Sequence, residues 1–474
     1  MKFALLFTLL VCAAIALPKS AAADILSDKT DNYVKEVLKA LHIPGLALAV
    51  VRDGKVIKAQ GYGLANVEFD APVKPETVFL LASMTKQFTA TCIMMLVEEG
   101  KVALDDGISK YLPDTPDSWK GITVRMLLNH TAGLKDRFEG KTGPEWLLTF
   151  TTDAMYKSAR GCALDFKPGA HFQYSDQGYF LLGMIIEKVS GKTYREYLTE
   201  RIFKPLEMAV SSTSLQTEIV KNLASGYTLT AGKLQHNHRR TDYGLVSHFG
   251  IISTVLDLAK WDAALYGERF LKKSSIEQMW TPGTVEEGMP SKIGSWHYGF
   301  GWFLDTFFGH RIVQHAGASG TCIWRLPDDK LTVIVLTNLE QLAGGDAPSI
   351  AKQIAQIYLP SVTWAVQKPS TDPDAKGTDT LREETLRIAL GKPDTALYTA
   401  EFGPLAKTAT QSSIGFYKSI GKLKGFEHLE TIGDNKSRTR RYRADYEKAT
   451  LYYTFRLAGA GKISFMGGEF EETL

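Results

Sequence analysis

Cysteine, long apolar runs and excess charge are all scarce in this sequence. Its four cysteines are too few and too widely spaced for a disulfide-stapled scaffold. No segment beyond the N-terminus approaches the roughly 20 apolar residues that a membrane-spanning helix needs. The formal charge of +3 is nearly balanced, so no electrostatic argument favours nucleic acid as a partner. Internal repeats and low-complexity tracts are also missing. What is left is a globular chain long enough for two or three domains.

The first 23 residues have the three parts of a secretory signal peptide. Lys2 supplies a positive charge, residues 3–17 form a short apolar core, and Ala21-Ala22-Ala23 offers a small-residue cleavage site. We therefore expect a mature chain that is secreted or periplasmic, without stable insertion into a membrane. Three cysteines would then remain, and whether any two of them pair stays open: Cys92, Cys162 and Cys322.

One short stretch, residues 79–88, carries a candidate nucleophile. Ser83 and Lys86 lie three residues apart at the start of a segment whose apolar residues recur at helical spacing up to Gly100. Positions i and i+3 share a helix face, so the Lys86 ammonium can reach the Ser83 hydroxyl. A helix N-terminus also presents unpaired N–H groups that suit a developing oxyanion. Both residue types are common, however, so the pair is informative only with partners elsewhere in the chain.

Strands are expected at both ends of residues 24–360, with a largely helical region between them. The first two form a hairpin around an Asp-Gly turn, and Gly61-Tyr62-Gly63 is expected to end it. Helices are predicted over 24–42, 83–100, 178–190, 194–203, 253–265 and 347–358. Strands are predicted over 46–51, 56–59, 298–303, 311–314, 321–326 and 332–337. A single sheet built from the two ends and covered by helices is the economical architecture.

The composition changes after residue 360. Residues 361–377 are predicted to be a linker, because proline, serine and aspartate gather there. The rest, 378–474, is expected to form a small α+β accessory domain. A helix is predicted over 378–391, residues 405–421 carry a weak amphipathic pattern, and strands are predicted over 426–432, 440–446, 450–457 and 463–467. The arginines of the second strand are expected to be exposed, and the aromatic residues of 442–455 to alternate between core and surface.

Two later motifs supply partners for Ser83. Tyr174 opens a Tyr-Ser-Asp sequence just before the predicted helix at 178. A phenol there can move a proton if a nearby ammonium favours its ionised form. His315 opens a His-Ala-Gly-Ala sequence on a predicted strand, where its side chain can line one wall of a cleft. Gly317 would let a substrate backbone approach closely.

These three motifs, in this order and at these separations, resemble those of the serine β-lactamase and penicillin-binding-protein superfamily. The likeness is greatest to the branch that holds class C β-lactamases, DD-peptidases, D-aminopeptidases and related esterases. It covers about residues 30–360 and includes Ile43-Pro44-Gly45, residues 127–134 and residues 298–302. The resemblance implies an α/β fold with an antiparallel sheet flanked by helices, plus an all-helical subdomain, with the site between them. The α+β domain that follows loosely resembles accessory domains of some members.

The resemblance also implies the catalytic roles. Ser83 would be the acylated nucleophile, and Lys86 would help to remove its proton. Tyr174 would relay that proton to the leaving group and act as the base for deacylation, and His315 would complete the catalytic group. No metal or cofactor is implied.

Three further positions are implied to contact the substrate: Asp176, Gly317 and Ala318. The backbone N–H groups of Ser83 and Ala318 would form the oxyanion hole, where losing one donor typically costs about a hundredfold in rate.

Two positions depart from the pattern of the family. Asp176 stands where many relatives have Asn, and its charge should hold Lys86 protonated unless the carboxylate is itself neutralised or turns away. His315 stands where β-lactamases have Lys, which helps them to hold a carboxylate-bearing antibiotic. A histidine is neutral for much of the time near pH 7. This disfavours efficient β-lactamase activity and favours esterase or D-amino-acid peptidase activity.

We therefore expect a secreted serine hydrolase that acts through a Ser83 acyl-enzyme on small esters or amides, with a small-molecule or peptide substrate as partner. Two alternatives stay open: a true β-lactamase, and a non-hydrolysing penicillin-recognising or peptidoglycan-binding protein. Self-association through the C-terminal domain is a further expectation. His130 is expected to be structural, and His236-x-His238 to be a solvated loop and not a metal site. Substrate selectivity is expected to depend on loops around Arg137, Phe138 and Trp296.

Overall fold

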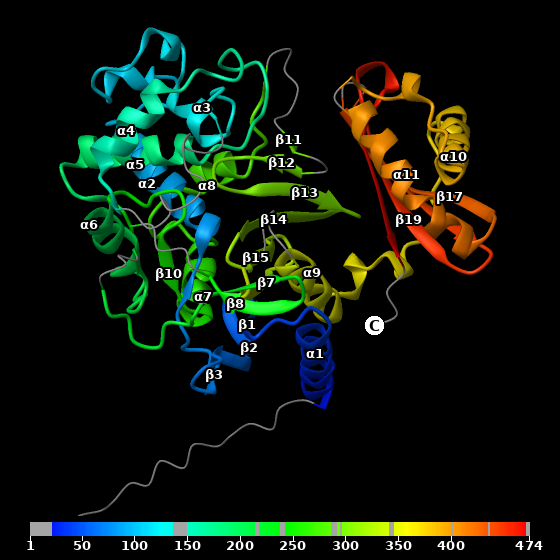
Figure 1. The fold of residues 1–474 in the computed structure, drawn as a ribbon, viewed down its shortest axis with the longest axis horizontal. Helices are drawn as coiled ribbons and strands as arrows, with labels where there is room; N and C mark the ends of the chain where they lie inside the picture. Colours follow the sequence, from blue (N-terminus) through cyan, green and yellow to red (C-terminus); the bar gives the residue numbers. More distant parts are fainter. Residues whose placement is uncertain are drawn as a thin grey trace, which may run out of the picture.

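A nine-stranded antiparallel sheet forms the centre of the larger part of the molecule (Figure 1). The computed structural model describes residues 21–135, 149–213, 218–237, 242–285, 292–293, 296–340, 346–400, 402–434 and 437–470. The strand order is β11-β12-β13-β14-β15-β16-β1-β2-β3. Strand β1 (Gly45–Arg52) pairs with β2 (Lys55–Asn66) on one side and with β16 (Leu331–Thr337) on the other. The two ends of residues 24–360 therefore meet in one sheet, as predicted.

The remaining strands of this sheet are β3 (Ala71–Pro72), β11 (Lys292–Ile293), β12 (Trp296–Tyr298), β13 (Phe303–Phe307), β14 (His310–Gly317) and β15 (Thr321–Leu326). Both faces are covered. Alternate residues of β1 enter two separate cores, one of which holds Leu46 and Leu48, the other Ala47 and Ala49. Helices α1 (Ala21–Ala40) and α9 (Ala347–Tyr358) pack on the first of these faces. Burial on both faces explains why β1 is a continuous apolar run without polar alternation.

The opposite face carries the helical region, in which α2 (Thr85–Glu98) is buried along most of its length. Around it lie α3 (Val124–Leu128), α4 (Thr152–Gly161), α5 (Asp176–Ser190), α6 (Tyr194–Leu198), α7 (Val255–Ala264) and α8 (Lys273–Met279). A second small sheet, β4-β10-β6 (Phe79–Leu80, Ile251–Ser253 and Ser212–Thr213), borders the start of α2. As predicted, α5 ends at Gly191, whose φ of +70° is the left-handed conformation that glycine adopts most easily.

Two local predictions in this part were wrong. Strand β2 does not end at Gly61-Tyr62-Gly63 but continues to Asn66. A Cβ on Gly61 would lie 2.1 Å from the carbonyl oxygen of Val73, so this glycine permits a close backbone approach beside β3 and does not mark a turn. The strand predicted over 298–303 is instead the connection between β12 and β13, which turns at Gly301 with a φ of +78°.

The C-terminal part forms its own four-stranded antiparallel sheet, in the order β17-β18-β19-β20 (Leu423–Gly433, Ser437–Tyr446, Thr450–Ala458 and Ile463–Phe470). Helices α10 (Ala375–Ala389) and α11 (Phe402–Ile420) pack with it, to the right of the larger part in Figure 1. The α+β composition, helix α10 and the four strands were predicted, and the weak amphipathic pattern over 405–421 falls on helix α11. The division at residues 360 and 378 stays a prediction.

The segment predicted to be a linker is packed against its surroundings. Trp364 is 5% exposed and stacks on Tyr452 of β19, with ring centroids 5.0 Å apart. Further along, the carboxylates of Asp372 and Asp374 both bind the Arg440 guanidinium. Residues 361–377 therefore join the two sheets through specific contacts.

The prediction of an exposed arginine face on β18 was wrong, because Arg440 and Arg441 are buried. Each guanidinium is compensated: Arg440 by the two aspartates just described, and Arg441 by Glu430. The aromatic residues do not alternate with solvent either, since all five are buried: Tyr442, Tyr446, Tyr452, Tyr453 and Phe455. Tyr452 belongs to the core around α9 and Tyr453 to the core around α11, so β19 is covered on both faces.

Buried arginines also hold the two sheets together. Arg456 of β19 donates to Asp305 Oδ1 of β13 (2.8 Å), and its Nη1 lies 2.9 Å from His297 Nε2 of β12. Arg441 donates to the carbonyl oxygen of Thr306 (2.7 Å). The C-terminal sheet is thus fixed to β13, which lies beside β14, and to β12, which lies beside β13.

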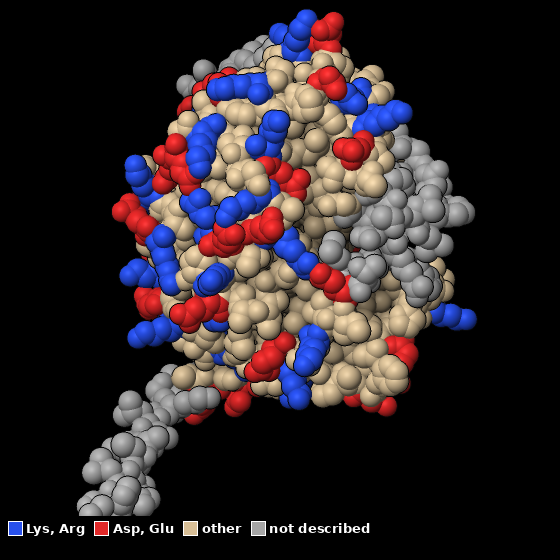
Figure 2. Space-filling model, turned by 90° about the vertical axis from the view of Figure 1, so that its left-hand side faces the viewer, with Lys and Arg blue, Asp and Glu red and all other residues tan. Residues whose placement is uncertain are grey.

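The surface seen in Figure 2 carries both signs of charge, with basic and acidic side chains interspersed over the residues drawn in colour. This agrees with the nearly balanced formal charge of +3. Among the described residues, no helix is long and apolar enough to cross a membrane.

Candidate active site

Ser83 lies in a short 3-10 turn, Ala82–Met84, that leads directly into α2. The residue before it, Ala82, has a φ of +47°, which is rare for a residue with a side chain. Leu81 is held on both sides: its N–H donates to Ile251 O of β10, and its carbonyl oxygen accepts from Thr321 Oγ1 of β15, each at 2.8 Å. An unfavourable backbone conformation that is maintained by surrounding contacts is common at functional sites. The turn therefore fixes where Ser83 points.

Lys86 lies one helical turn further on, with its side chain completely buried. Its Nζ is 3.2 Å from Ser83 Oγ, 2.7 Å from Asp176 Oδ1 and 2.9 Å from the carbonyl oxygen of His248. An ammonium has three N–H donors and no acceptor, and here three oxygens surround it. The geometry is thus that of a charged lysine whose donors all have partners, one of them the Ser83 hydroxyl.

The third of these partners, His248 O, was not predicted from the sequence. It lies in a buried segment fastened to two helices: Thr89 Oγ1 of α2 donates to Ser247 O (2.6 Å), and Ser247 Oγ donates to Tyr179 O of α5 (2.9 Å). Gly183 makes room, because a Cβ there would lie 2.2 Å from Ser247 Oγ. A backbone carbonyl leaves no residue-type signature, so no motif could have identified it.

Asp176 reaches Lys86 because it is the first residue of α5. The preceding Ser175 caps that helix: its Oγ accepts from Gly178 N–H (3.2 Å) and donates to Lys135 O (2.7 Å). The carboxylate of Asp176 does not turn away, although 34% of its side chain is exposed. Asp176 and Lys86 therefore form an ion pair, with Oδ1 and Nζ 2.7 Å apart.

Tyr174 stands beside the same ammonium. Lys86 Nζ lies 4.7 Å from the centre of the Tyr174 ring, within the distance of a cation–π contact. The ring is parallel to that of Phe303, with centroids 6.3 Å apart, and packs on His130 at 4.3 Å. The predicted relay residue is therefore held by aromatic contacts next to the Ser83–Lys86 pair.

His130 contacts both Tyr174 and the backbone of the neighbouring Ser175. Its Nδ1 accepts a hydrogen bond from Ser175 N–H (3.1 Å), and its ring packs on Tyr174, Tyr179 and Tyr298. Burial, with Lys86 nearby, holds the pKa of His130 well below its usual value. It is thus a neutral residue bonded to nearby backbone, as expected from the sequence.

His315 occupies β14 and is 1% exposed. Its Nδ1 lies 2.7 Å from Ala316 O, which can only accept, so Nδ1 carries the proton and Nε2 accepts from the Tyr298 hydroxyl at 3.0 Å. Burial, reinforced by the Lys86 charge, lowers the pKa of His315 to about 3. The position expected to replace the lysine of β-lactamases therefore carries no charge near neutral pH.

The end of β14 lies against the Ser83 turn. A Cβ on Gly317 would lie 2.1 Å from Leu81 O and 3.1 Å from Ala82 Cβ, so only glycine permits this approach. Ala318 follows in the turn to β15. The structure thus gathers every predicted site residue in one region: Ser83, Lys86, Tyr174, Asp176, His315, Gly317 and Ala318.

Other predicted features lie elsewhere. Arg137, Phe138 and His238 fall outside the described residues. His236 Nε2 lies 2.6 Å from Glu68 Oε1. In the part of the chain that the structure describes, no group of three or more His, Cys, Asp or Glu side chains is placed to hold a metal ion. The three cysteines after the signal-like segment are buried free thiols, which settles the question of pairing.

With the geometry in hand, the sequence can be placed in a family. The family model described as Beta-lactamase matches residues 30–356, well over half of the chain. The chain belongs to the beta-lactamase family. A penicillin-binding protein of Bacillus subtilis is 28% identical over 391 residues, which cover 78% of this chain and 83% of the relative. Family membership supports a serine hydrolase of the β-lactamase and penicillin-binding-protein superfamily in general terms.

Solved structures of the family share the fold. The octameric penicillin-binding protein homologue from Pyrococcus abyssi is 26% identical, with a TM-score of 0.61 over 94% of this chain and 96% of that one. EstCE1, a hydrolase with promiscuous acyltransferase activity, is 24% identical, with a TM-score of 0.62 over 71% of this chain and 99% of that one. At this identity the second likeness concerns the fold alone. The family model ends at residue 356, before the C-terminal sheet begins.

Proposed function

We propose that this protein is a secreted hydrolase that forms an acyl-enzyme on Ser83 and acts on small esters or amides. The observation that carries the proposal is the position of Lys86 Nζ, 3.2 Å from Ser83 Oγ and 4.7 Å from the Tyr174 ring centre. One ammonium is thus placed to orient the nucleophile and to favour the ionised form of the phenol. That combination suits proton removal from a serine.

The proposed acylation assigns the base to Tyr174. As described above, Lys86 already donates to three oxygens, so it is placed to act as a charge and not as the proton acceptor that the sequence suggested. The phenolate of Tyr174 takes the Ser83 proton while Oγ attacks the substrate carbonyl carbon. The carbonyl oxygen becomes an oxyanion, held by the backbone N–H groups of Ser83 and Ala318. When the C–O or C–N bond breaks, Tyr174 returns the proton to the leaving group.

Deacylation repeats these steps with water. Tyr174 takes a proton from water, whose oxygen attacks the acyl carbon and forms a second oxyanion in the same place. The ester bond to Ser83 breaks, and Oγ recovers the proton from Tyr174. His315 takes no proton in this cycle. It is a positioning residue that holds the Tyr298 hydroxyl at the edge of the aromatic group around Tyr174.

The charges around Ser83 favour uncharged acyl groups. The Lys86 ammonium is compensated by Asp176, and His315 is neutral. A carboxylate-bearing β-lactam would therefore meet no fixed cation on β14. This supports an esterase or amide hydrolase over a β-lactamase.

A paired assay tests the proposal. A chromogenic p-nitrophenyl ester of a short acid and a chromogenic cephalosporin are each offered to the wild-type protein and to Ser83→Ala. We expect the wild type to hydrolyse the ester much faster than the cephalosporin, and Ser83→Ala to hydrolyse neither. Fast cephalosporin turnover would support the β-lactamase alternative. A stable adduct without turnover of either compound would support a penicillin-recognising protein.

Secretion and self-association complete the proposal. The signal-like segment predicts export with cleavage before residue 24, although α1 begins at Ala21. N-terminal sequencing of the exported protein tests this, and retention of residues 1–23 would contradict it. The relative from Pyrococcus abyssi is octameric and aligns with nearly the whole chain, which supports self-association. Light scattering on the full chain and on a chain ending at 365 shows whether the C-terminal domain mediates it.

A further inference from the structure

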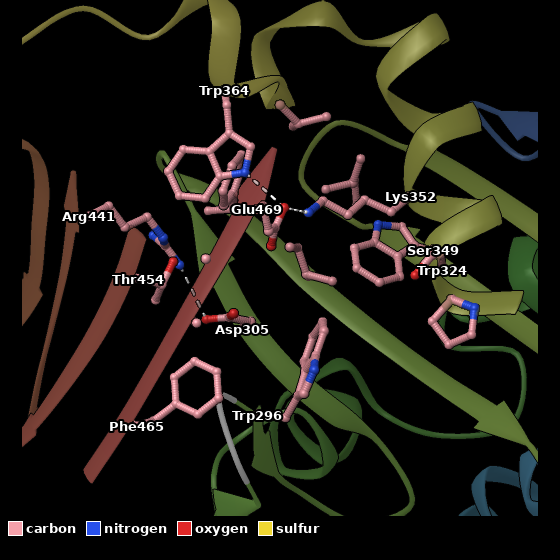
Figure 3. Close-up of a pocket in the computed structure, with 17 residues that line it drawn as sticks. Trp296, Asp305, Trp324, Ser349, Lys352, Trp364, Arg441, Thr454, Phe465 and Glu469 are labelled. Carbon is pink, nitrogen blue, oxygen red and sulfur yellow. Dashed lines mark hydrogen bonds and ion pairs between the residues drawn. The ribbon is translucent and has the colours of Figure 1, made fainter. Parts of the chain in front are cut away.

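A cavity of about 380 Å³ lies between the nine-stranded sheet and the C-terminal sheet (Figure 3). None of its lining residues belongs to the group around Ser83. Its apolar floor comes from β13, β14 and β15, through Phe307, Ile312, Trp324 and Leu326, and β18, β19 and β20 supply the facing wall. The volume falls within the range of small-ligand pockets, about 300–1,000 Å³.

Aromatic rings form much of the wall. Trp296 of β12 and Trp324 of β15 meet edge to face, with centroids 5.6 Å apart. Trp364 stands at another side of the cavity and Phe465 of β20 near Trp296, as Figure 3 shows. Rings of this size offer large, rigid apolar surfaces to a flat or alicyclic molecule at little entropic cost.

Two indole N–H groups at this cavity have no acceptor among the described residues, those of Trp296 and Trp324. Trp324 is 5% exposed as a residue, but its Nε1 is not enclosed as the Nε1 atoms of Trp119, Trp280 and Trp302 are, so this donor faces open space. The third indole differs, because Trp364 Nε1 donates to Glu469 Oε2 at 2.9 Å. A donor that opens into a cavity can bind water or an acceptor of the occupant. An occupant with an acceptor oxygen would give these two donors a partner.

The charges around the cavity are already compensated. Lys352 Nζ pairs with Glu469 Oε2 at 2.5 Å, and Arg441 pairs with Glu430. Behind the wall, Arg456 pairs with Asp305 at 2.8 Å. Three cations thus face three carboxylates, and a charged ligand would be desolvated here without a free counter-charge. The compensated charges around the cavity therefore favour an uncharged occupant.

We propose that this cavity is a binding site for a small, uncharged, largely aromatic or alicyclic molecule with a carbonyl or similar acceptor oxygen. The molecule contacts both sheets, so its binding holds the C-terminal domain against the larger part. The cavity also shares strand β14 with the catalytic group, because Ile312 lines it and His315 lies three residues further along the same strand. Trp324 is paired in register with Gln314, the neighbour of His315, and Trp296 lies two residues before Tyr298.

Three probes with one naphthalene skeleton test the charge preference on the full-length protein. They are 2-naphthamide, which is uncharged with a carbonyl oxygen, its near-isostere 2-naphthoate, and 2-naphthylmethylammonium. Titration calorimetry is expected to show one saturable site per chain for the amide, with the two ions weaker by about tenfold or more. Absence of amide binding at millimolar concentration, or tighter binding of either ion, would overturn the proposal.

Variants locate the site. Thr454→Phe fills the cavity from β19 and is expected to abolish amide binding. Thr408→Phe, the same change on the exposed side of α11, is expected to leave it unchanged. Should Thr454→Phe fail to fold, Trp324→Phe replaces the indole by a smaller aromatic ring without the N–H donor, and should weaken amide binding by about five- to tenfold. Amide binding that is unchanged in the folded cavity variants would place the probe elsewhere and overturn the proposal.

Discussion

Lys86 and Asp176 form an ion pair at 2.7 Å in the candidate active site, with Ser83 Oγ as a further partner of the same ammonium at 3.2 Å. The two residues come from α2 and α5, which are 90 positions apart at this contact. The carboxylate keeps the lysine in its charged form, and the lysine in turn offsets the carboxylate beside Tyr174. The pH dependence of the reaction should therefore depend on Asp176.

Asp176→Asn should move the pH–rate profile to lower pH, because the change removes a negative charge beside the Lys86 ammonium. Without the carboxylate, a phenolate at Tyr174 persists at lower pH, which shifts the acidic limb. The Lys86 ammonium also loses its proton at lower pH, which shifts the basic limb. The measurement is kcat/KM for ester hydrolysis between pH 5 and 10. Asp117→Asn, which removes an exposed carboxylate paired with Lys120, is the control and should change nothing. A profile unmoved by Asp176→Asn would show that the ion pair does not govern either proton transfer.

Tyr174→Phe should lower kcat/KM by about 10²–10⁴, the usual contribution of a general base. The ring contacts with Phe303 and His130 stay, so the fold should not change. Steady-state ester hydrolysis measures the loss, and rapid mixing separates acylation from deacylation. Tyr417→Phe, which removes a hydroxyl bonded to Tyr453 outside the site, is the matched control. Unchanged turnover in Tyr174→Phe would exclude the phenol as the base.

Gly317→Ala should damage the site and spare the fold. The new Cβ would lie 2.1 Å from Leu81 O, so the turn that presents Ser83 must shift. A displacement of about 1 Å can reduce the rate a hundredfold. Gly415→Ala in α11 meets no atom within 4 Å and serves as the control. Ester kcat/KM is measured beside the thermal unfolding temperature. Full activity in Gly317→Ala would mean that close contact between β14 and the Ser83 turn is not required.

His315 should make the protein less stable in acid. Its pKa is about 3 when folded and about 6.5 when unfolded, so between these values the unfolded chain binds a proton that the folded chain does not. The free energy of unfolding therefore falls as the pH drops below about 6.5. The contribution of this residue is about 2 kcal/mol at pH 5. His315→Gln removes it.

Urea unfolding gives the free energy of unfolding at pH 7.5 and at pH 5, and the loss between these two pH values is compared between the wild type and His315→Gln. The loss of stability between the two values should be smaller in His315→Gln than in the wild type. The contribution of His130, which is also buried and neutral, is common to both proteins and cancels. Equal losses would mean that His315 accepts a proton in the folded state.

Much of the fold could be predicted because its elements have strong local signals. The residue patterns and turn signals of the C-terminal part predicted β17 to β20 and helix α10, and Gly191 predicted the end of α5. The Ser83, Tyr174 and His315 motifs predicted residues that the structure brings together, because the role proposed for each side chain depends on its chemical type.

What could not be predicted depends on partners far away in the sequence. The sequence predicted an exposed strand face at Arg440 and Arg441. In the structure both are buried, because they form ion pairs with Asp372, Asp374 and Glu430. Gly61 was predicted to lie at the end of the hairpin, because the close contact between its backbone and the carbonyl oxygen of Val73 has no signal in the sequence. His248 contributes only its carbonyl oxygen, which every residue type carries.

The most direct test of the central claim is intact-protein mass spectrometry after brief mixing with a p-nitrophenyl ester. The wild type is expected to gain the mass of one acyl group, peptide mapping is expected to place it on Ser83, and Tyr174→Phe is expected to accumulate the same adduct more slowly. Ser83→Ala should gain no mass and release no p-nitrophenol above the buffer rate. Equal ester hydrolysis by the wild type and Ser83→Ala, or an acyl group on another residue, would contradict it.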